Sequence, residues 1–280
     1  LWVVEGSTYP TRAGDPPMPR PDDDPHLDTL TPEEKASLFG GTDRILIFSD
    51  EDGDGVYETR KVFLENLNLV SGIEVGFGGV YVGAAPYFLH VPLDASGDKP
   101  AGAPRVLADG FGWQDTHETL NSFIWGPDGW LYGCHGVFTQ SQVRVCTGPV
   151  GTRKRIPMNC AYWRWHPVRQ EFELFAQGTS NPWGLDYNAR GQFFSEACVI
   201  PHFWHVIPGA YYLRQSNPLG HFNPYVYRNI ETIADHTHFS GGKPSFGQSD
   251  NRGSSDEFGG GHAHCGLCVY DGLNFPAQYR

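Results

Sequence analysis

Apolar and polar residues alternate with a period of two in four short segments of this chain. Each segment opens on a small residue, and the first and third residues after it are apolar. The apolar pairs are Ile73 and Val75, Phe123 and Trp125, Leu185 and Tyr187, and Leu267 and Val269. This period is typical of a strand that buries one of its two faces. We therefore predict a strand at each of the four openings, which are Gly72, Ser122, Gly184 and Gly266.

Turn sequences follow the first three of these segments. They are Gly-Phe-Gly at 76–78, Gly-Pro-Asp-Gly at 126–129 and Asn-Ala-Arg-Gly at 188–191. A glycine that takes a positive φ in such a turn joins two antiparallel strands. Second strands are therefore predicted at 80–82, 131–133 and 193–195. A hairpin that recurs at intervals long enough for a four-stranded blade indicates an all-β fold of the β-propeller type.

Other elements can be recognised between these hairpins. Further strand pairs are predicted at 44–48 with 58–64 and at 160–165 with 171–175. Thr31 and Glu34, with Pro32 between them, form a capping box that predicts one short helix. The helix falls in a Pro- and Asp-rich insertion at 6–42, which we interpret as a surface excursion. Residues 199–260 are irregular and rich in His, Gly and aromatics, and are predicted to form long loops.

These elements predict a single domain over residues 1–280, a partial propeller of about four blades with long loops. The first part is a partial blade at 1–65, interrupted by the insertion at 6–42. Blades follow at 66–115, 116–178 and 179–260, the last with long loops, and the next blade begins at 261–280. Both ends of the chain are expected to lie within a blade, which indicates a piece of a longer protein.

Composition narrows the possible functions. The chain has 39% hydrophobic and 19% charged residues, as in globular proteins, and a net charge of −12. An acidic chain without a basic face is not expected to bind nucleic acid. No run approaches the roughly 20 apolar residues of a membrane span. Among the six cysteines, Cys134 and Cys146 are interpreted either as a disulfide across a hairpin or as buried free thiols.

Polar residues stand four positions before each opening of the repeat. They are Asn68, Glu118, Ser180 and His262, with His117, Asn121, Asn181 and His264 beside them. Inner strands of a propeller surround one channel, so these positions are expected to converge at one rim and form a binding site. His202, His236 and His238 are also expected to line it. The alternative is that such residues cap strands and bond loop backbone.

His117 is the candidate catalytic residue of this rim. An imidazole takes up a proton near neutral pH, so it can act as a general base toward a substrate hydroxyl. Glu118 beside it is predicted to orient a substrate or to raise the pKa of the imidazole. The alternative for a single loop histidine is a structural role.

Carboxylates alternate in an acidic turn at Asp50, Asp52, Asp54 and Glu58. Carboxylate oxygens around a glycine-containing turn are the ligands that calcium prefers, so a structural Ca²⁺ site is predicted there. Lys61 stands where an EF-hand requires its glutamate, which excludes that motif. The alternative is an acidic, solvated turn. A zinc site in the His- and Cys-rich segment 262–268 would require a bend, because alternate side chains of an extended segment point to opposite faces.

Two stretches of the chain resemble a known family. Residues 117–133 and 178–196 are similar to the paired signatures of the soluble quinoprotein glucose and sorbosone dehydrogenases, which are six-bladed propellers. The chain looks closest to the branch described as membrane-bound dehydrogenase domains. In that branch the segments 1–5, 52–55, 181–184 and 262–264 have counterparts in the same order.

The resemblance implies an activity and its components. His117 matches the family's base, which takes a hydroxyl proton while hydride passes to pyrroloquinoline quinone (PQQ). It also implies a sugar or alcohol substrate, a c-type cytochrome as electron acceptor and a periplasmic or extracellular location. The chain departs from the family at Ser180, where the glucose enzymes have an arginine, and at 198–202, which replaces their segment for calcium and cofactor.

Three functions therefore remain open from the sequence. The first is a quinone-dependent oxidoreductase that oxidises a sugar or a related alcohol or aldehyde, with calcium. The second is a non-catalytic propeller that binds carbohydrate or protein, which the departure at Ser180 favours. The third and weakest is a metal-dependent hydrolase similar to the six-bladed lactonases.

Overall fold

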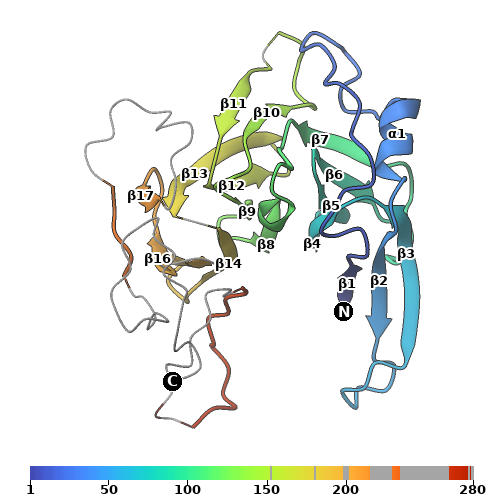
Figure 1. The fold of residues 1–280 in the computed structure, drawn as a ribbon. Helices are drawn as coiled ribbons and strands as arrows, with labels where there is room; N and C mark the ends of the chain where they lie inside the picture. The colour runs from blue at the N-terminus through green and yellow to red at the C-terminus, as the bar shows by residue number, and fades with distance from the viewer. Residues whose placement is uncertain are drawn as a thin grey trace, which may run out of the picture. The chain divides into compact units, whose positions relative to one another are not determined.

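The structure is a computed structural model that describes residues 1–151, 153–179, 181–197, 202–214, 229–233, 265–276 and 278 (Figure 1). The chain divides into two compact units, each described here by itself. The first unit comprises Leu1–Asn121, Gln140–Pro157 and Pro167–Glu171. The second unit comprises Ser122–Thr139, Met158–His166 and Phe172–Arg280. Strands account for most of the regular structure in the described residues.

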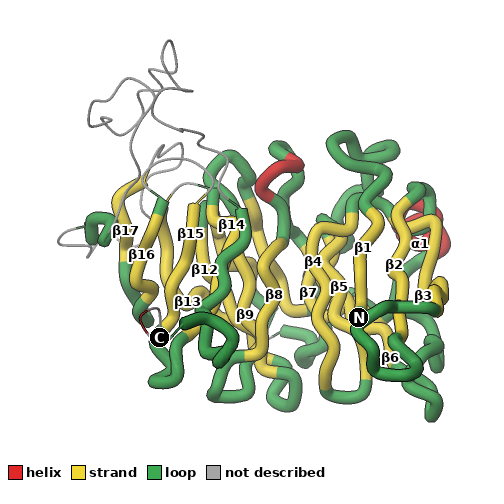
Figure 2. The backbone as a smooth tube through the Cα atoms, turned by 90° about the horizontal axis from the view of Figure 1, so that it is seen from below, coloured by secondary structure: helices red, strands yellow, loops and turns green. Residues whose placement is uncertain are grey.

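The first unit contains two antiparallel sheets (Figures 1 and 2). One has the order β1-β2-β3, formed by β1 (Trp2–Glu5), β2 (Asp43–Ser49) and β3 (Thr59–Leu67). The other has the order β11-β10-β7-β6-β5-β4. Its strands are β4 (Val70–Gly76), β5 (Gly79–Ala84), β6 (Tyr87–Pro92), β7 (Arg105–Asp109), β10 (Ser141–Val145) and β11 (Arg155–Met158).

The insertion between β1 and β2 packs into the core of the first unit. Its helix α1 (Pro32–Leu38) begins with the predicted capping box, in which Glu34 N donates to Thr31 Oγ1 at 3.2 Å and Thr31 N to Glu34 Oε2 at 2.8 Å. Leu27 and Leu38 are each 1% exposed and belong to the same apolar cluster as Ile45 of β2. The helix prediction is confirmed. Most other residues of 6–42 are half-buried or exposed, so the insertion runs over the surface while these two leucines reach the core.

A buried arginine also holds the insertion in place. Arg144 of β10 is fully buried, and its Nε donates to Asp109 Oδ1 of β7 at 3.0 Å. Its Nη1 donates to Asp22 Oδ1 of the insertion at 2.6 Å, and Arg155 Nη2 lies 2.9 Å from the same oxygen. This network joins two strands and the insertion through charge-assisted hydrogen bonds.

The second unit also contains two sheets. One has the order β17-β13-β12-β9-β8, formed by β8 (Asn121–Trp125), β9 (Leu131–His135), β12 (Ala161–His166), β13 (Glu171–Thr179) and β17 (Tyr211–Arg214). The other, β14-β15-β16, is formed by β14 (Pro182–Tyr187), β15 (Phe193–Ala197) and β16 (Phe203–Val206). The aromatic rings of Tyr132, Phe175 and Phe193 meet in its core, the first two edge to face at 5.0 Å.

The predicted all-β, propeller-type fold with long loops is confirmed in its blade-like sheets, which are mainly antiparallel apart from the parallel pair β13 and β17. The hairpin β4–β5 pairs Ile73 with Val82, and β14–β15 pairs Leu185 with Ser195, as the alternation predicts. The turn glycine Gly129 takes the expected positive φ of 80°. A short 3₁₀ helix, η1 (Thr116–Glu118), precedes β8.

Three predictions about local structure need correction. Residues 266–269 are not a strand; they lie along β14, with Gly266 N donating to Trp183 O at 2.7 Å and Val269 N to Asp186 Oδ2 at 2.7 Å, and no strand ladder forms. The region 199–260 is not all loop, since β16 and β17 fall within it. Cys134 and Cys146 are buried free thiols, so the disulfide alternative is wrong.

Among the described residues, no helix has the length and apolar character that a membrane crossing demands.

Candidate functional site

His117 lies on η1 in the first unit and is exposed. Asp115 is the N-cap of this helix, and its Oδ1 accepts a hydrogen bond from His117 N at 3.0 Å. A carboxylate at this position satisfies one of the backbone N–H groups that have no partner within a helix. The cap therefore holds the backbone of His117 while its ring remains at the surface.

The insertion supplies a second contact to His117. The hydroxyl of Tyr9 is hydrogen-bonded to Nδ1 of His117, and the two rings lie edge to face with centroids 5.2 Å apart. Beside them, Thr116 Oγ1 donates to Pro10 O. Because Tyr9 engages Nδ1, the orientation of the His117 ring is set from outside its own segment.

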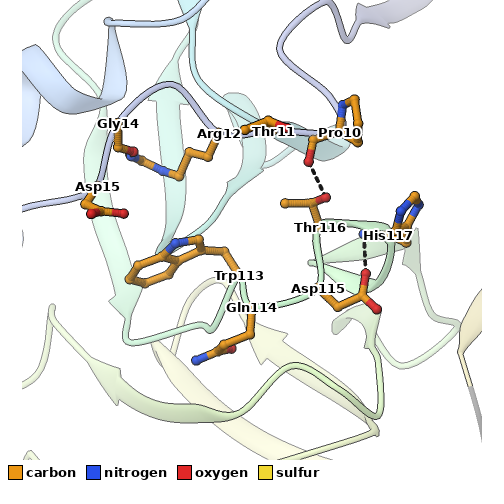
Figure 3. Close-up of a pocket in the computed structure, with 10 residues that line it drawn as sticks. All are labelled: Pro10, Thr11, Arg12, Gly14, Asp15, Trp113, Gln114, Asp115, Thr116 and His117. Atoms are coloured by element: carbon orange, nitrogen blue, oxygen red, sulfur yellow. Dashed lines mark hydrogen bonds between the residues drawn. The ribbon is translucent and has the colours of Figure 1, made fainter.

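A pocket of about 510 Å³ opens beside His117 (Figure 3). It is lined by Pro10, Thr11, Arg12, Gly14, Asp15, Trp113, Gln114, Asp115, Thr116 and His117. In Figure 3 the indole of Trp113 lies between the side chains of Arg12 and Gln114. An aromatic face surrounded by carboxylate, amide and hydroxyl groups suits a neutral ligand that carries hydroxyl groups.

Arg12 has a structural role in the wall of this pocket. It is 8% exposed; its Nε donates to Ala85 O at 3.3 Å and its Nη2 to Ser37 Oγ at 2.8 Å. Burial lowers the pKa of Arg12, against the opposing effects of Tyr87 and Asp15. Because its donors are directed at neutral oxygens of the protein, Arg12 shapes the wall of the pocket.

The other predicted residues of the first unit are held inside the protein. Glu118 and Asn121 are fully buried, and Asn121 Nδ2 donates to Thr119 O at 2.9 Å. Asn68 donates to Ala13 O and Ser37 O, each at 2.9 Å, and so anchors the insertion. The pocket beside His117 is not lined by these three side chains. The hydrogen bonds of Asn68 and Asn121 to backbone carbonyls are those that the alternative of the sequence analysis describes, and a role of Asn121 in binding stays a prediction.

In the second unit, part of the predicted rim is described. Asn181 is half-buried, and its Oδ1 is buried with no hydrogen-bond partner among the described residues. His202 is half-buried, and its carbonyl accepts a hydrogen bond from Ala197 N at 2.7 Å. Ser180, His236, His238, His262 and His264 lie outside the described residues. The expected convergence of the whole rim stays a prediction.

Glu196 is a candidate that the sequence analysis missed. It lies on β15 opposite Gly184 of β14 and is 6% exposed. Both carboxylate oxygens are buried without a hydrogen-bond partner in the part of the chain that the structure describes. Burial raises the pKa of Glu196 to about 8, against a smaller lowering by the backbone N–H of Gly266. A single glutamate within an otherwise buried strand segment was the available signal in the sequence.

Two glycines near Glu196 mark a close contact between β14 and the segment at 265–269. A Cβ on Gly184 would lie 2.7 Å from Leu267 N and 3.0 Å from the Gly266 carbonyl carbon, so β14 and the segment at 265–269 are in close contact. Gly266 itself has a φ of 89°, which favours glycine. The N–H of Gly266 donates to Trp183 O, as described above. Burial of Glu196 beside this contact favours the protonated form of its carboxyl group.

The acidic turn brings its four predicted carboxylates together. One oxygen from each of Asp50, Asp52, Asp54 and Glu58 can be chosen so that all lie within 4.8 Å of one another. Backbone N–H groups also use this turn: Gly53 N donates to Asp50 Oδ1 at 2.7 Å, and Gly55 N to Asp50 Oδ2 at 2.9 Å. The arrangement has the size and chemistry of an oxygen-ligand cation site at the tip of the β2–β3 hairpin.

A family model described as a domain of unknown function, DUF7133, matches residues 1–280. This chain belongs to the DUF7133 family. No curated protein matches it significantly. Among solved structures, the PQQ-bound form of the aldose sugar dehydrogenase of Streptomyces coelicolor is similar, with 16% identity and a TM-score of 0.42. That match covers 68% of this DUF7133 chain and 64% of the dehydrogenase chain.

Proposed function

We propose that this chain is the propeller part of an oxidoreductase that oxidises a sugar or a related alcohol, with His117 as the general base. The observation that supports this most is the exposed imidazole of His117 at a pocket with an aromatic face and several oxygen groups. A base must lie within hydrogen-bond reach of the hydroxyl that it deprotonates, and His117 is one of the residues that line the pocket.

Each pocket residue has a role in this proposal. Nε2 of His117 accepts the proton of the substrate hydroxyl, while Tyr9 holds the ring through Nδ1. Trp113 packs against the apolar face of a sugar ring, and Asp15 and Gln114 bind its hydroxyl groups. Asp115 keeps the backbone of η1 in place through its capping bond.

The oxidant in this proposal is a quinone, on the basis of the sequence resemblance. When bound, a quinone supplies the acceptor for the hydride that leaves the carbinol carbon. The family's cofactor residues correspond to Ser180 and 198–202, most of which lie outside the described residues. Next to them, Thr179 pairs with Arg214, whose buried Nε has no hydrogen-bond partner within the described ranges. A cation with an unused donor fits a cofactor that carries carboxylates.

The test is dye-linked oxidation by the full-length protein after incubation with PQQ and Ca²⁺, over a panel of aldoses and alcohols. We expect turnover of at least one substrate and a loss of about 100-fold or more in His117→Ala, because a general base contributes that much. His26→Ala is the matched control, since His26 is an exposed histidine of the same unit outside the pocket.

Two outcomes would overturn this function. Full activity of His117→Ala would remove the base from the mechanism, and inactivity over the whole panel would remove the oxidoreductase. Glycan binding without dye reduction that survives His117→Ala would indicate the non-catalytic, carbohydrate-binding propeller. One tightly held divalent ion with lactone hydrolysis would indicate the lactonase-like enzyme. The c-type cytochrome acceptor and the periplasmic or extracellular location belong to the same proposal.

We also propose that the acidic turn holds a structural Ca²⁺. Ca²⁺ at ten times its dissociation constant is expected to stabilise the fold by about 1.4 kcal/mol, because the ion binds only the folded turn. For a chain of this size that is a rise in melting temperature of roughly 3 °C. Differential scanning fluorimetry with and without a chelator measures it.

Two neighbouring carboxylates provide a test variant and a control for the calcium prediction. Asp52→Asn should remove the rise, whereas Glu51→Gln should keep it, because only Asp52 belongs to the cluster. A melting temperature that is the same in Ca²⁺ and chelator would assign the turn to the solvated alternative.

A further inference from the structure

Arg214 is a buried cation at the end of a strand in the second unit. It is the last residue of β17 and is 7% exposed. In the parallel pairing of β13 with β17, Arg214 stands opposite Thr179, the last residue of β13. The next residue along the chain is Ser180. Arg214 is thus paired with the residue that precedes, in the sequence, the position where the resembling dehydrogenases carry an arginine.

Neutral acceptors hold one end of its guanidinium group. Nη1 donates to Asn159 Oδ1 at 2.6 Å, and Nη2 donates to Asn159 O at 2.8 Å. Asn159 is itself fully buried, and its Nδ2 donates to Val137 O. Because its amide nitrogen is engaged there, Asn159 must present its oxygen to Arg214. The guanidinium group is therefore fixed in orientation before any ligand binds.

The opposite edge of the guanidinium group has no acceptor. An arginine has five N–H donors in a planar fork, and the edge that begins at Nε offers two parallel donors. Nε of Arg214 is buried and makes no hydrogen bond in the described part of the chain. A buried donor without an acceptor is strongly unfavourable, so this edge needs an acceptor.

The charge of Arg214 also lacks a counter-ion. Within the described ranges, the ion pairs do not include Arg214. Burial lowers the pKa of Arg214, and only Cys160 and Tyr211 oppose it. Arg144, which is equally removed from water, has two carboxylates. Because buried charges in proteins are paired, the difference indicates that Arg214 needs an anion beyond those of the described residues.

We propose that Arg214 is the recognition group of an anion site for a small molecule that carries a carboxylate. Two parallel N–H donors in one plane match the two oxygens of a carboxylate. Two sources share this chemistry: a quinone with carboxylate groups, and a carboxylated sugar such as a uronate. The site rests on the proposed function only for the first source. In that case Arg214 replaces, from the neighbouring strand, the cation that is absent at Ser180.

The test is calorimetric titration of the full-length protein with PQQ, glucuronate, glucose and inorganic phosphate in separate arms. We expect at least one carboxylate ligand to bind and Arg214→Gln to weaken it roughly 10- to 100-fold, the range for a charge-assisted pair. The affinity of Arg214→Lys should lie between those of the natural sequence and Arg214→Gln, because an ammonium group keeps the charge but lacks the two parallel donors. Arg164→Gln is the matched control, since Arg164 of the same unit already has Glu173 and Asp128 as partners.

The separate titrations distinguish the two kinds of carboxylate ligand. Binding of PQQ that needs Arg214, without glucuronate binding, assigns the site to the quinone; the reverse assigns it to a sugar acid. Either result stands if the oxidoreductase assay fails. If Arg214→Gln does not fold, the test uses two other measurements. They are ligand binding by Arg214→Lys and the rise in the melting temperature of the natural sequence when an anion is added. Equal binding by the natural sequence and Arg214→Gln, or tighter binding of phosphate or glucose than of either carboxylate, would overturn the proposal.

Discussion

Arg144→Met is expected to lower the free energy of unfolding by about 3 kcal/mol, because it leaves a largely buried carboxylate without its partner. The Arg144 side chain is fully buried, and that of Asp109 is 13% exposed. Asp22 is half exposed and has Arg155 as a second partner, so the removal of Arg144 destabilises Asp22 less than Asp109. Urea denaturation followed by tryptophan fluorescence measures the change.

Arg105→Met is the control for this prediction. Arg105 opens the same strand, β7, and pairs with Asp28 at 3.1 Å, but its side chain is 43% exposed. Exposed pairs contribute less than about 1 kcal/mol, so this variant should be close to the natural sequence. Adding Asp109→Leu to Arg144→Met should recover part of the loss, since the orphaned charge is then gone. Equal losses in the two single variants would contradict the role given to the buried network.

Glu196→Gln is expected to remove a large pH dependence of stability. The pKa of Glu196 is about 8 in the folded protein, against 4.5 as the ordinary value. Between these values the folded state holds a proton that the unfolded state has released, so stability falls as pH rises. The contribution of the raised Glu196 pKa to the free energy of unfolding is fully present below pH 4.5 and is lost once the pH passes 8. A shift of this size corresponds to a loss on the order of 4 kcal/mol.

Unfolding in urea at pH 5 and at pH 8.5 tests this. The natural sequence should lose stability relative to Glu196→Gln between the two pH values, because glutamine keeps the shape and does not ionise. Glu173→Gln is the matched control from the same unit, where the side chain is 47% exposed; its difference from the natural sequence should be the same at both pH values. A constant difference for Glu196→Gln as well would show that Glu196 ionises normally in the fold.

Local structure in this chain follows closely from local sequence. The period of two located β4, β5, β14 and β15, and the glycine turns located the hairpins that join them. The Thr31 and Glu34 pair located α1, because a capping box acts within one turn of backbone. The same reasoning failed for 266–269, where the apolar alternation is present but no partner strand supplies a ladder.

The candidate site was predictable only in part. His117 could be named as a candidate base because its residue type and motif suggest that role, which stays a prediction. Its partner Tyr9 was missed, since it is 108 residues away in the chain and comes from an insertion without periodicity. Glu196 and Arg214 were missed for a similar reason: a charged residue is unusual only when its surroundings are apolar and its partners are absent.

The sequence by itself determined the class of fold, the hairpins, the helix and the carboxylates of the acidic turn, because these depend on neighbours within a few residues. Tertiary structure alone decided that Leu27 and Leu38 of the insertion enter the core, and that Arg144 has two carboxylates. It also decided that Glu196 and Arg214 are buried with no counter-charge in the part of the chain that the structure describes. The physical reason is that burial and pairing depend on which strands lie side by side. Desolvation, which gives these side chains their chemistry, is a property of that packing.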